Sequence, residues 1–421
     1  MQPLLEIFRD FAKKEGIADK AFIVGGAVRD ILLSKELKDI DIAIIGEALN
    51  IAERFAKEIN GSFVLLDKEF GTARVVKNGE FLDISVMRGD SILSDLSERD
   101  ITINAMAIPL TNFQPSAFSL QHLIDPYNGK NDLFNGIIKM VSEENLIKDP
   151  LRILRIYRFA ATLNFSVEKE TLNAAGRLSP LITAVAVERI TEELRHIIRL
   201  DDSYKTIKNM KDAGILSFLF IELKECSLEL YKTVEKILNN PSLYFLDYSA
   251  PIFKYFETDY RKICLKLSTL FPDSDTARQS AMRLRMSKKE VEFIHGMSSN
   301  RNRIADLYKK GTGSPDNTAS ISLLKEFKDH IYPLAILSIA KEPPITSFCH
   351  EIIIFYNEKF KTKMDILPII TGNDLIKEFN LKPSPLFKKI LAAVEDLVLE
   401  GRVASKEEAL KAVRGMLKTE M

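Results

Sequence analysis

The stretch Ala21–Ile45, AFIVGGAVRDILLSKELKDIDIAII, decides how the N-terminal part of the chain folds. It opens with a short apolar run that predicts a buried strand, which ends at Gly25-Gly26 where a helix is expected to begin. A second apolar strand follows the helix and carries Asp39 and Asp41 at its start. Side chains two residues apart in a strand point to the same face, so both carboxylates are expected to project side by side from one sheet.

These features together predict a site for a nucleoside triphosphate bound through a metal ion. Backbone N–H groups at a Gly-Gly turn suit a phosphate, and paired carboxylates suit Mg²⁺. In two-metal nucleotidyl transfer, one ion lowers the pKa of an attacking hydroxyl and the other neutralises the leaving pyrophosphate. An Asp-x-Asp pair alone is common by chance as a solvated or capped strand end. The preceding G-G-x-V-R-D, at this distance, favours the functional interpretation.

The composition sets the outer bounds. The chain has 421 residues, of which 46% are hydrophobic, enough for a large core divided over two or more domains. Its 59 basic and 59 acidic residues cancel, but a basic face can coexist with an acidic one, so an RNA partner is not excluded. Cys226, Cys264 and Cys349 lie far apart and are expected to be free thiols, not disulfides or zinc ligands.

The first sixteen residues predict an amphipathic packing helix and not a signal peptide. No uninterrupted apolar run is long enough to span a bilayer. We therefore expect a cytoplasmic protein with no membrane partner. The apolar stripe of the N-terminal helix consists of Leu4, Leu5, Phe8, Phe11 and Ala12.

Downstream of the Asp-x-Asp strand, the pattern predicts a helix and three strands, at 48–59, 63–66, 73–76 and 81–87. Asn78-Gly79, between the last two strands, is the strongest hairpin signal in the chain. Asp83 lies within the third strand. It is either a third carboxylate turned towards Asp39 and Asp41 or a solvated strand residue, and the sequence leaves both interpretations open.

Near Met140 the strand patterns almost vanish, and helix-length periodic segments continue to the C-terminus. This change predicts an α+β protein with a mixed-sheet head followed by an all-α remainder. The turn-rich segment 309–317, KKGTGSPDN, indicates a surface loop or domain boundary. The expected domains are a head, a helical neck, a helical body and a helical tail, at 1–140, 141–200, 201–315 and 316–421.

A second polar group lies at 97–105, SERDITINA, where Arg99, Asp100 and Asn104 are closely spaced. An arginine near a triphosphate makes charge-assisted bonds to its oxygens, and Asp and Asn side chains suit ribose hydroxyls. Thr102 is expected to cap a helix that starts there. In isolation, the same segment is typical of the start of a surface helix.

A third group lies at 148–158, KDPLRILRIYR, where the Asp-Pro pair predicts a helix start. Arg152, Arg155 and Arg158 recur every third residue and stay near one helix face. Like charges at this spacing repel one another unless an anion lies over them. The stripe therefore indicates an anionic ligand, with a solvated basic face as the alternative.

Taken in order, these segments resemble motifs A to E of the class II tRNA nucleotidyltransferases. That family comprises the CCA-adding enzymes and the related bacterial poly(A) polymerases, in the polymerase-β-like superfamily. The resemblance spans residues 21–195, and 371–410 is similar to the tail of such enzymes. The matching motifs are G-G-x-V-R-D with D-x-D, R-D-x-T-I-N-A, D-P-x-x-G-x-x-D-L, D-P-L-R-x-L-R-x-x-R-F-A and Glu188-Arg189-Ile190.

The resemblance implies a polymerase-β-like head and assigns roles residue by residue. Gly26 and Arg29, next to Gly25, match positions that hold the incoming triphosphate. Asp39 and Asp41 match the metal ligands, with Mg²⁺ as the cofactor. The other nucleotide-binding positions that the motifs imply are Arg99, Asp100, Asn104, Arg155 and Arg158.

Asp149 and Arg152 match the pair that reads the base, and Glu188 and Arg189 match residues that brace it. The pairing edge of cytosine suits an Asp acceptor and an Arg donor, and adenine also fits. Guanine and uracil present a ring N–H to the arginine, a mismatch that a buried site rejects. Protein side chains would thus replace a nucleic-acid template.

Three departures from the family motifs are present. Glu98 stands where an arginine often precedes Arg99, and Lys148 stands where a glutamate often precedes Asp149. Only the segment 84–98, whose first residues finish the third head strand, separates Asp83 from Arg99. Full CCA-adding enzymes carry a longer flexible segment that is thought to re-aim the base-reading pair from C to A. The short link resembles the CC-adding branch.

The resemblance therefore predicts an enzyme that extends the 3′ end of tRNA from CTP, stopping after CC. The alternatives are a full CCA-adding enzyme using CTP and ATP, an A-adding or poly(A) polymerase, and a non-catalytic tRNA-binding protein. The tail is a candidate for tRNA binding, and the sequence leaves the oligomeric state open. Asp329-His330 is expected to lie on a helix surface and not in a hydrolytic metal site.

Overall fold

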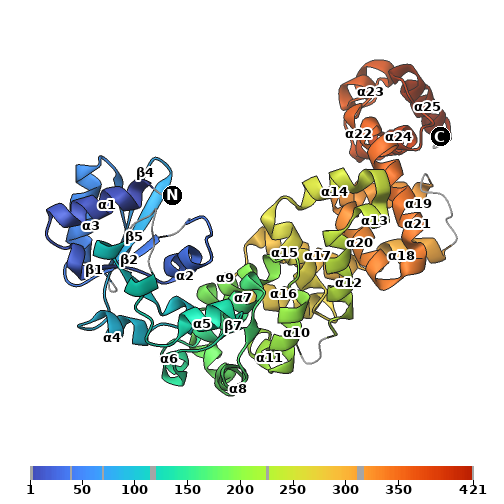
Figure 1. Cartoon of the computed structure of the whole chain (residues 1–421). Coiled ribbons are helices and arrows are strands. Elements are labelled where there is room, and N and C mark those ends of the chain that lie inside the picture. Colours follow the sequence, from blue (N-terminus) through green and yellow to red (C-terminus); the bar gives the residue numbers. More distant parts are fainter. Residues whose placement is uncertain are drawn as a thin grey trace. The chain divides into compact units, whose positions relative to one another are not determined.

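The computed structural model describes residues 3–37, 40–68, 71–113, 120–223, 227–310 and 317–419. The chain forms two compact units, Met1–Ile221 and Glu222–Met421 (Figure 1). The predicted limits at 140, 200 and 315 stay predictions. Cys226 and most of the 309–317 loop lie outside the described residues.

The first unit contains a six-stranded mixed sheet with the order β3-β4-β5-β2-β1-β6. Strands β2 and β5 are parallel, and the other neighbours are antiparallel. This arrangement confirms the predicted α+β head and its five predicted strands, whereas β6 was not predicted. The strands are β1 Ala21–Val24, β2 Ile40–Ile44, β3 Ser62–Asp67, β4 Thr72–Lys77, β5 Glu80–Val86 and β6 Ala107–Pro109.

The predicted hairpin lies between β4 and β5, where Lys77 pairs with Glu80. Asn78 has φ 52° and Gly79 has φ 84°. A tight hairpin turn with positive φ at both central residues is the one that Asn-Gly favours, because its twist matches that of the strands. The local sequence thus sets the register of β4 and β5.

One face of the sheet is covered by α1 Pro3–Lys14 and α3 Ala48–Glu58, both at the predicted places. The five apolar residues predicted for the α1 stripe are all buried, and the Phe8 ring packs edge-on against Phe55 with 4.9 Å between centroids. Each large side chain buried there contributes roughly 1.5–3 kcal/mol. In β2, alternation places Ile40, Ile42 and Ile44 on one face and Asp41 with Ala43 on the other.

The opposite face carries Asp41, one of the residues predicted to form the site. Ala43 packs in a cluster with Val24, Met87, Leu96 and Ala107, so Asp41 projects from this side. The elements on or near this face include α2 Gly26–Leu32 and α4 Ile92–Ser97.

Beyond the sheet the first unit is almost entirely helical, as predicted (Figure 1). Two short strands, β7 Ile137–Ile138 and β8 Ser166–Val167, form a parallel pair. The helices are α5 Gly129–Phe134, α6 Glu143–Lys148, α7 Leu151–Leu163, α8 Lys169–Leu178, α9 Val187–Arg199, α10 Tyr204–Asp212 and α11 Ile215–Leu219.

The described part of the second unit is helical, and within the described ranges no helix of the chain is long and apolar enough to cross a membrane. Its last helices, α23 to α25, enclose an apolar core of their own. The helices are α12 Glu229–Asn239, α13 Ser242–Phe245, α14 Ser249–Phe256, α15 Asp259–Ser268, α16 Ser274–Arg283, α17 Lys288–Asn300, α18 Arg303–Lys309, α19 Thr318–Phe327, α20 Ile331–Lys341, α21 Thr346–Phe355, α22 Lys361–Asp365, α23 Gly372–Phe379, α24 Pro385–Leu399 and α25 Lys406–Thr419.

His330 differs from the prediction of a surface histidine. Its ring packs perpendicular to Phe293, with 5.4 Å between centroids, and it shares a hydrogen bond with the Tyr255 hydroxyl. Burial lowers the pKa of His330. The prediction failed because the aromatic partners come from distant helices. Among the residues that the structure describes, no cluster of three or more His, Cys, Asp or Glu could hold a metal ion.

Candidate active site

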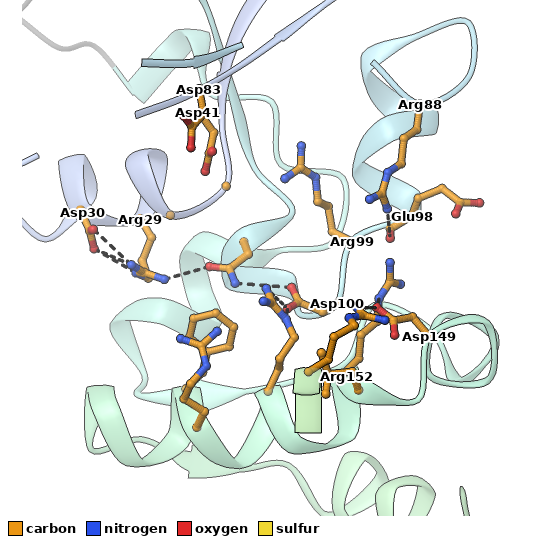
Figure 2. A pocket seen from close by; sticks show the side chains of 18 of the residues that line it. Arg29, Asp30, Asp41, Asp83, Arg88, Glu98, Arg99, Asp100, Asp149 and Arg152 are labelled. Carbon is orange, nitrogen blue, oxygen red and sulfur yellow. Dashed lines mark hydrogen bonds and ion pairs between the residues drawn. The ribbon is translucent and has the colours of Figure 1, made fainter. Parts of the chain in front are cut away.

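A pocket of about 680 Å³ lies in the first unit between the sheet and α7 (Figure 2). Figure 2 shows Asp41 with Asp83 at one end and Asp149 with Arg152 at the other. Asp39 lies outside the described residues, and Glu188 is exposed in the first turn of α9 and is not one of the lining residues. The predicted site residues that line the pocket are Gly25, Gly26, Arg29, Asp41, Arg99, Asp100, Asn104, Asp149, Arg152, Arg155, Arg158 and Arg189.

Strand register builds the acidic end. Asp41 and Asp83 are Cα partners on β2 and β5, and Arg74 on β4 is the Cα partner of Asp83. Arg74 binds Asp83 through two hydrogen bonds of 2.7 and 2.8 Å, and its guanidinium lies 3.9 Å from the centre of the Phe81 ring. Asp83 therefore lies beside Asp41 with an arginine partner, and its role as a third metal ligand stays a prediction.

Gly25 shapes the space next to Asp41. Its φ is +67°, and a Cβ at this position would lie 3.3 Å from Asp41 Oδ2 and 3.4 Å from Arg99 Nη1. A side chain would be strained by the backbone and would crowd both groups. The glycine thus keeps a gap between the carboxylate and the guanidinium.

A chain of hydrogen bonds crosses the pocket floor (Figure 2). Arg29 binds Asp30 through Nε and Nη2, at 2.9 and 3.1 Å, and donates through Nη1 to Asn104 Oδ1 at 3.0 Å. Asn104 in turn contacts Asp100 at 3.4 Å. The chain continues to Arg155, whose Nε donates to Asp100 Oδ2 at 2.8 Å. It joins a helix of the head to α7.

Asp100 is buried at the centre of this chain. Burial alone would raise the pKa of Asp100, but the Arg155 charge and the hydrogen bonds from Arg155 and Ile101 outweigh burial and lower it. The carboxylate is therefore an anion that holds Arg155, and its predicted contact with ribose stays a prediction. Thr102 was wrong as a helix cap, since it begins a 3₁₀ turn and donates to Asp132 at 2.7 Å.

The three arginines of α7 face the pocket, but their surroundings differ. Arg158 Nε donates to Glu193 at 2.6 Å, and Arg155 lies between Asp100 and Glu193. Glu193 is a buried residue of α9 that the motifs did not single out. A carboxylate within the apolar stripe of that helix, between Ile190 and Leu194, is the signal that could have indicated it.

Arg152 is the exception in the stripe. Its side chain is buried, and its Nη1 has no hydrogen-bond partner among the described residues. Burial lowers the pKa of Arg152, and its Nε lies 3.9 Å from Asp149 Oδ2. Asp149 also accepts a hydrogen bond of 3.1 Å from Arg189. A buried donor without an acceptor is costly, so this position favours a ligand that supplies one.

Three family models match separate parts of the chain. Residues 21–139 match the family model of the poly(A) polymerase head domain. Residues 164–226 match the model described as the probable RNA and SrmB-binding site of polymerase A, and 352–413 match the model of tRNA nucleotidyltransferase domain 2. A CC-adding tRNA nucleotidyltransferase of Synechocystis sp. is 30% identical over 401 residues, covering 93% of this chain and 92% of that protein. The chain belongs to the tRNA nucleotidyltransferase family.

Other members of the family carry other specificities. An A-adding tRNA nucleotidyltransferase of Halalkalibacterium halodurans is 27% identical over 415 residues, covering 93% of this chain and 88% of that protein. A solved structure of the Thermotoga maritima CCA-adding enzyme, complexed with tRNA, aligns with a TM-score of 0.75 and 25% identity. The alignment covers 99% of this chain and 96% of that one. Overall similarity therefore establishes the family and the fold.

In this tRNA nucleotidyltransferase, two of the three motif departures are partners in one ion pair. Glu98 Oε1 lies 2.8 Å from Lys148 Nζ. The hydrogen bond from Lys148 is the main cause that lowers the pKa of Glu98. The acid and the base have exchanged places relative to the motifs described above, and opposite charges still join the segment before Arg99 to the segment before Asp149.

The third departure, the short link at 84–98, is an ordered part of the nucleotidyltransferase head. Residues through Val86 complete β5, and Ser91 caps α4 by accepting a hydrogen bond of 3.2 Å from the Ser94 N–H. Gly89 has φ +73°, and a Cβ there would lie 2.4 Å from Ser94 Oγ. The turn is therefore packed directly against the helix that follows it.

Proposed function

We propose that the chain adds CMP residues from CTP to the 3′ end of tRNA without a nucleic-acid template, and that it stops after CC. The observation that carries this proposal is Arg152 Nη1, a buried donor without a partner among the described residues, beside the acceptor Asp149. An acceptor and a donor at adjacent positions match the amino group and ring nitrogen of cytosine. A base with a ring N–H would set donor against donor.

The charge balance of the pocket supports a triphosphate ligand. The lining contains eight arginines against six acidic residues. Arginine forms bidentate, charge-assisted hydrogen bonds with phosphate oxygens. We propose that Gly26, Arg29 and Arg99 hold the triphosphate. Arg155 and Arg158, through their ion pairs with Asp100 and Glu193, keep the base-reading helix in place.

The donor set at the other end fits Mg²⁺. Asp41 supplies carboxylate oxygens at the pocket wall, with Asp83 beside it, and hard oxygen ligands are those that Mg²⁺ prefers. We propose Asp41 together with Asp39 as the metal ligands. When bound, Mg²⁺ lowers the pKa of the attacking hydroxyl and offsets phosphate charge.

The residues of this chain orient the two reactants. Asp149 and Arg152 hold the cytosine, which aligns the α-phosphate with the carboxylate end of the pocket. The terminal ribose 3′-hydroxyl of tRNA attacks that phosphate, and pyrophosphate leaves towards the arginines. Holding both reactants in one geometry removes much of the entropic barrier to their encounter.

Two observations support a stop after CC. The link at 84–98 is short and packed, with little chain left for a mobile lever. The relative from Synechocystis sp., which is 30% identical over 401 residues, is a CC-adding enzyme, whereas the A-adding relative is 27% identical. Since adenine is larger than cytosine, ATP would need the Asp149–Arg152 pair to be displaced.

Product lengths on a sequencing gel test the proposal. A tRNA lacking its 3′ tail is expected to gain two C residues from mixed CTP and ATP and then stall. A tRNA that already ends in CC is expected to remain unextended by ATP. Conversion of both substrates to full CCA would contradict the CC-adding proposal. It would support the nearest alternative, a full CCA-adding activity like that of the Thermotoga maritima enzyme.

A further inference from the structure

Asp95, a residue of α4 outside every motif, is a buried carboxylate next to the pocket wall. Its exposed fraction is 2%. A charge buried to this degree is tolerated only when it is paired and hydrogen-bonded. The partners of Asp95 therefore indicate what it does.

One oxygen of Asp95 holds the side chain of Arg99. Its Oδ2 accepts hydrogen bonds from Arg99 Nε at 3.0 Å and from Nη2 at 2.6 Å. These donors lie along one edge of the planar guanidinium. The plane and direction of the Arg99 side chain are thus fixed, and Nη1 is left on the far side.

The remaining Arg99 nitrogen faces the acidic end of the pocket (Figure 2). Nη1 and Asp41 Oδ2 both lie next to Gly25, at 3.4 and 3.3 Å from the position of a Cβ there. A triphosphate whose α-phosphate lies near Asp41 would meet Nη1 directly. By holding Arg99 in this orientation, Asp95 directs the Nη1 donor towards the expected position of the α-phosphate.

The main chain on both sides is held as well. The other Asp95 oxygen, Oδ1, accepts a hydrogen bond of 3.0 Å from the Arg88 N–H. Asn145, a buried residue of α6, donates to the carbonyls of Ser97 and Arg99 at 2.7 and 2.8 Å. Arg99 is consequently fixed at its backbone and at its guanidinium before any nucleotide binds.

We propose that Asp95 is a positioning residue that pre-organises Arg99 for the triphosphate of the incoming nucleotide. This inference rests on the proposed function. Preorganised donors cost no rearrangement when charge arrives, and a loosely held arginine would lose side-chain entropy on binding. We therefore expect Asp95 to contribute to binding of the triphosphate and not to recognition of the base.

The test compares CTP with CMP in the full chain. Asp95→Asn keeps the shape of the side chain but removes its charge. The variant is expected to bind CTP roughly tenfold more weakly, the scale of one weakened charge-assisted hydrogen bond. Its CMP affinity and its preference for CTP over UTP are expected to stay within about twofold of the wild type. Asp90→Asn, an exposed acid of the same segment, is the matched control and is expected to change neither affinity.

Arg99→Lys tests the same contact from the arginine side. A lysine ammonium lacks the planar edge through which Arg99 donates two hydrogen bonds to Asp95. The variant is expected to show the same CTP-selective loss, and adding Asp95→Asn to it is expected to weaken CTP binding little further. If the loss of CTP affinity in the double variant equals the product of the losses in the two single variants, the inference is overturned. Equal losses for CTP and CMP in Asp95→Asn would also overturn it, since that result describes general destabilisation.

The wild type separates this inference from the function on which it rests. Absence of CMP incorporation by the wild-type chain would overturn the proposed function. Normal incorporation by the wild type together with unchanged CTP affinity in Asp95→Asn would overturn the positioning role alone.

Discussion

At the sheet end of the pocket, backbone hydrogen bonds between β2 and β5 place Asp41 and Asp83. At the helical end, carboxylates from distant segments place Arg155 and Arg158 of α7. A strand register is shared by many bonds and does not depend on any one side chain. The geometry of an ion-pair network depends on each of its side chains. Single substitutions are therefore expected to act on chemistry at the sheet end and on both stability and selectivity at the helical end.

The largest effect is expected from Asp41→Ala at the sheet end. Removing this proposed metal ligand is expected to lower CMP incorporation by roughly 10³-fold or more, while tRNA binding and the melting temperature persist. Incorporation and a gel-shift assay measure the two properties separately. Asp19→Ala, an exposed carboxylate of the same unit, is the control. Near-normal incorporation by Asp41→Ala would contradict the metal assignment.

Glu193→Leu is expected to lower the stability of the fold, in contrast to Asp41→Ala, because it removes the carboxylate between Arg155 and Arg158. Arg158 is half-buried and loses its Glu193 partner, whereas Arg155 keeps Asp100, so the expected cost is about 1–3 kcal/mol of unfolding free energy. Urea denaturation measures the loss. Glu192→Ala, next to it but exposed, is expected to change stability little. Equal unfolding free energies of the two variants would show that the ion-pair network does not hold α7 in place.

Arg152→Ala removes the donor that has no partner in the described structure. The expected result is a roughly tenfold lower rate with CTP and relaxed discrimination against UTP and GTP, because the opposing donor is gone. Competition between nucleotides measures selectivity. Exposed Arg177 offers the control variant Arg177→Ala. Intact selectivity with a lower rate would contradict the base-reading role.

The smallest effect is expected at the ion pair that bridges the two motif segments. The side chains of Glu98 and Lys148 are 37% and 56% exposed. Reversing either charge is therefore expected to change the activation free energy that kcat/KM for CTP reports by less than about 1 kcal/mol. The double reversal, Glu98→Lys with Lys148→Glu, is expected to restore the wild-type value. Additive losses in the double variant would show that the pair does not act as a unit.

Local sequence signals predicted the sheet end well. The hairpin at Asn78-Gly79, the strand containing Asp41 and the α1 stripe depend on turn chemistry and on periodicity, which short segments contain in full. The helical end was predicted only in part. The spacing of Arg152, Arg155 and Arg158 indicated a shared face, but their differing partners were not predictable, because Asp100 and Glu193 approach from 55 and 35 residues away.

The sequence by itself determined the α+β head, the helical remainder and the motif residues that gather around one pocket. Spacing along a helix or strand converts directly into direction, so these features follow from local rules. Tertiary structure alone decided which arginine is left with an open donor, that Glu98 faces Lys148, and that Asp95 grips Arg99. Such pairings depend on the distances between whole elements, and those distances are set by packing of the entire unit.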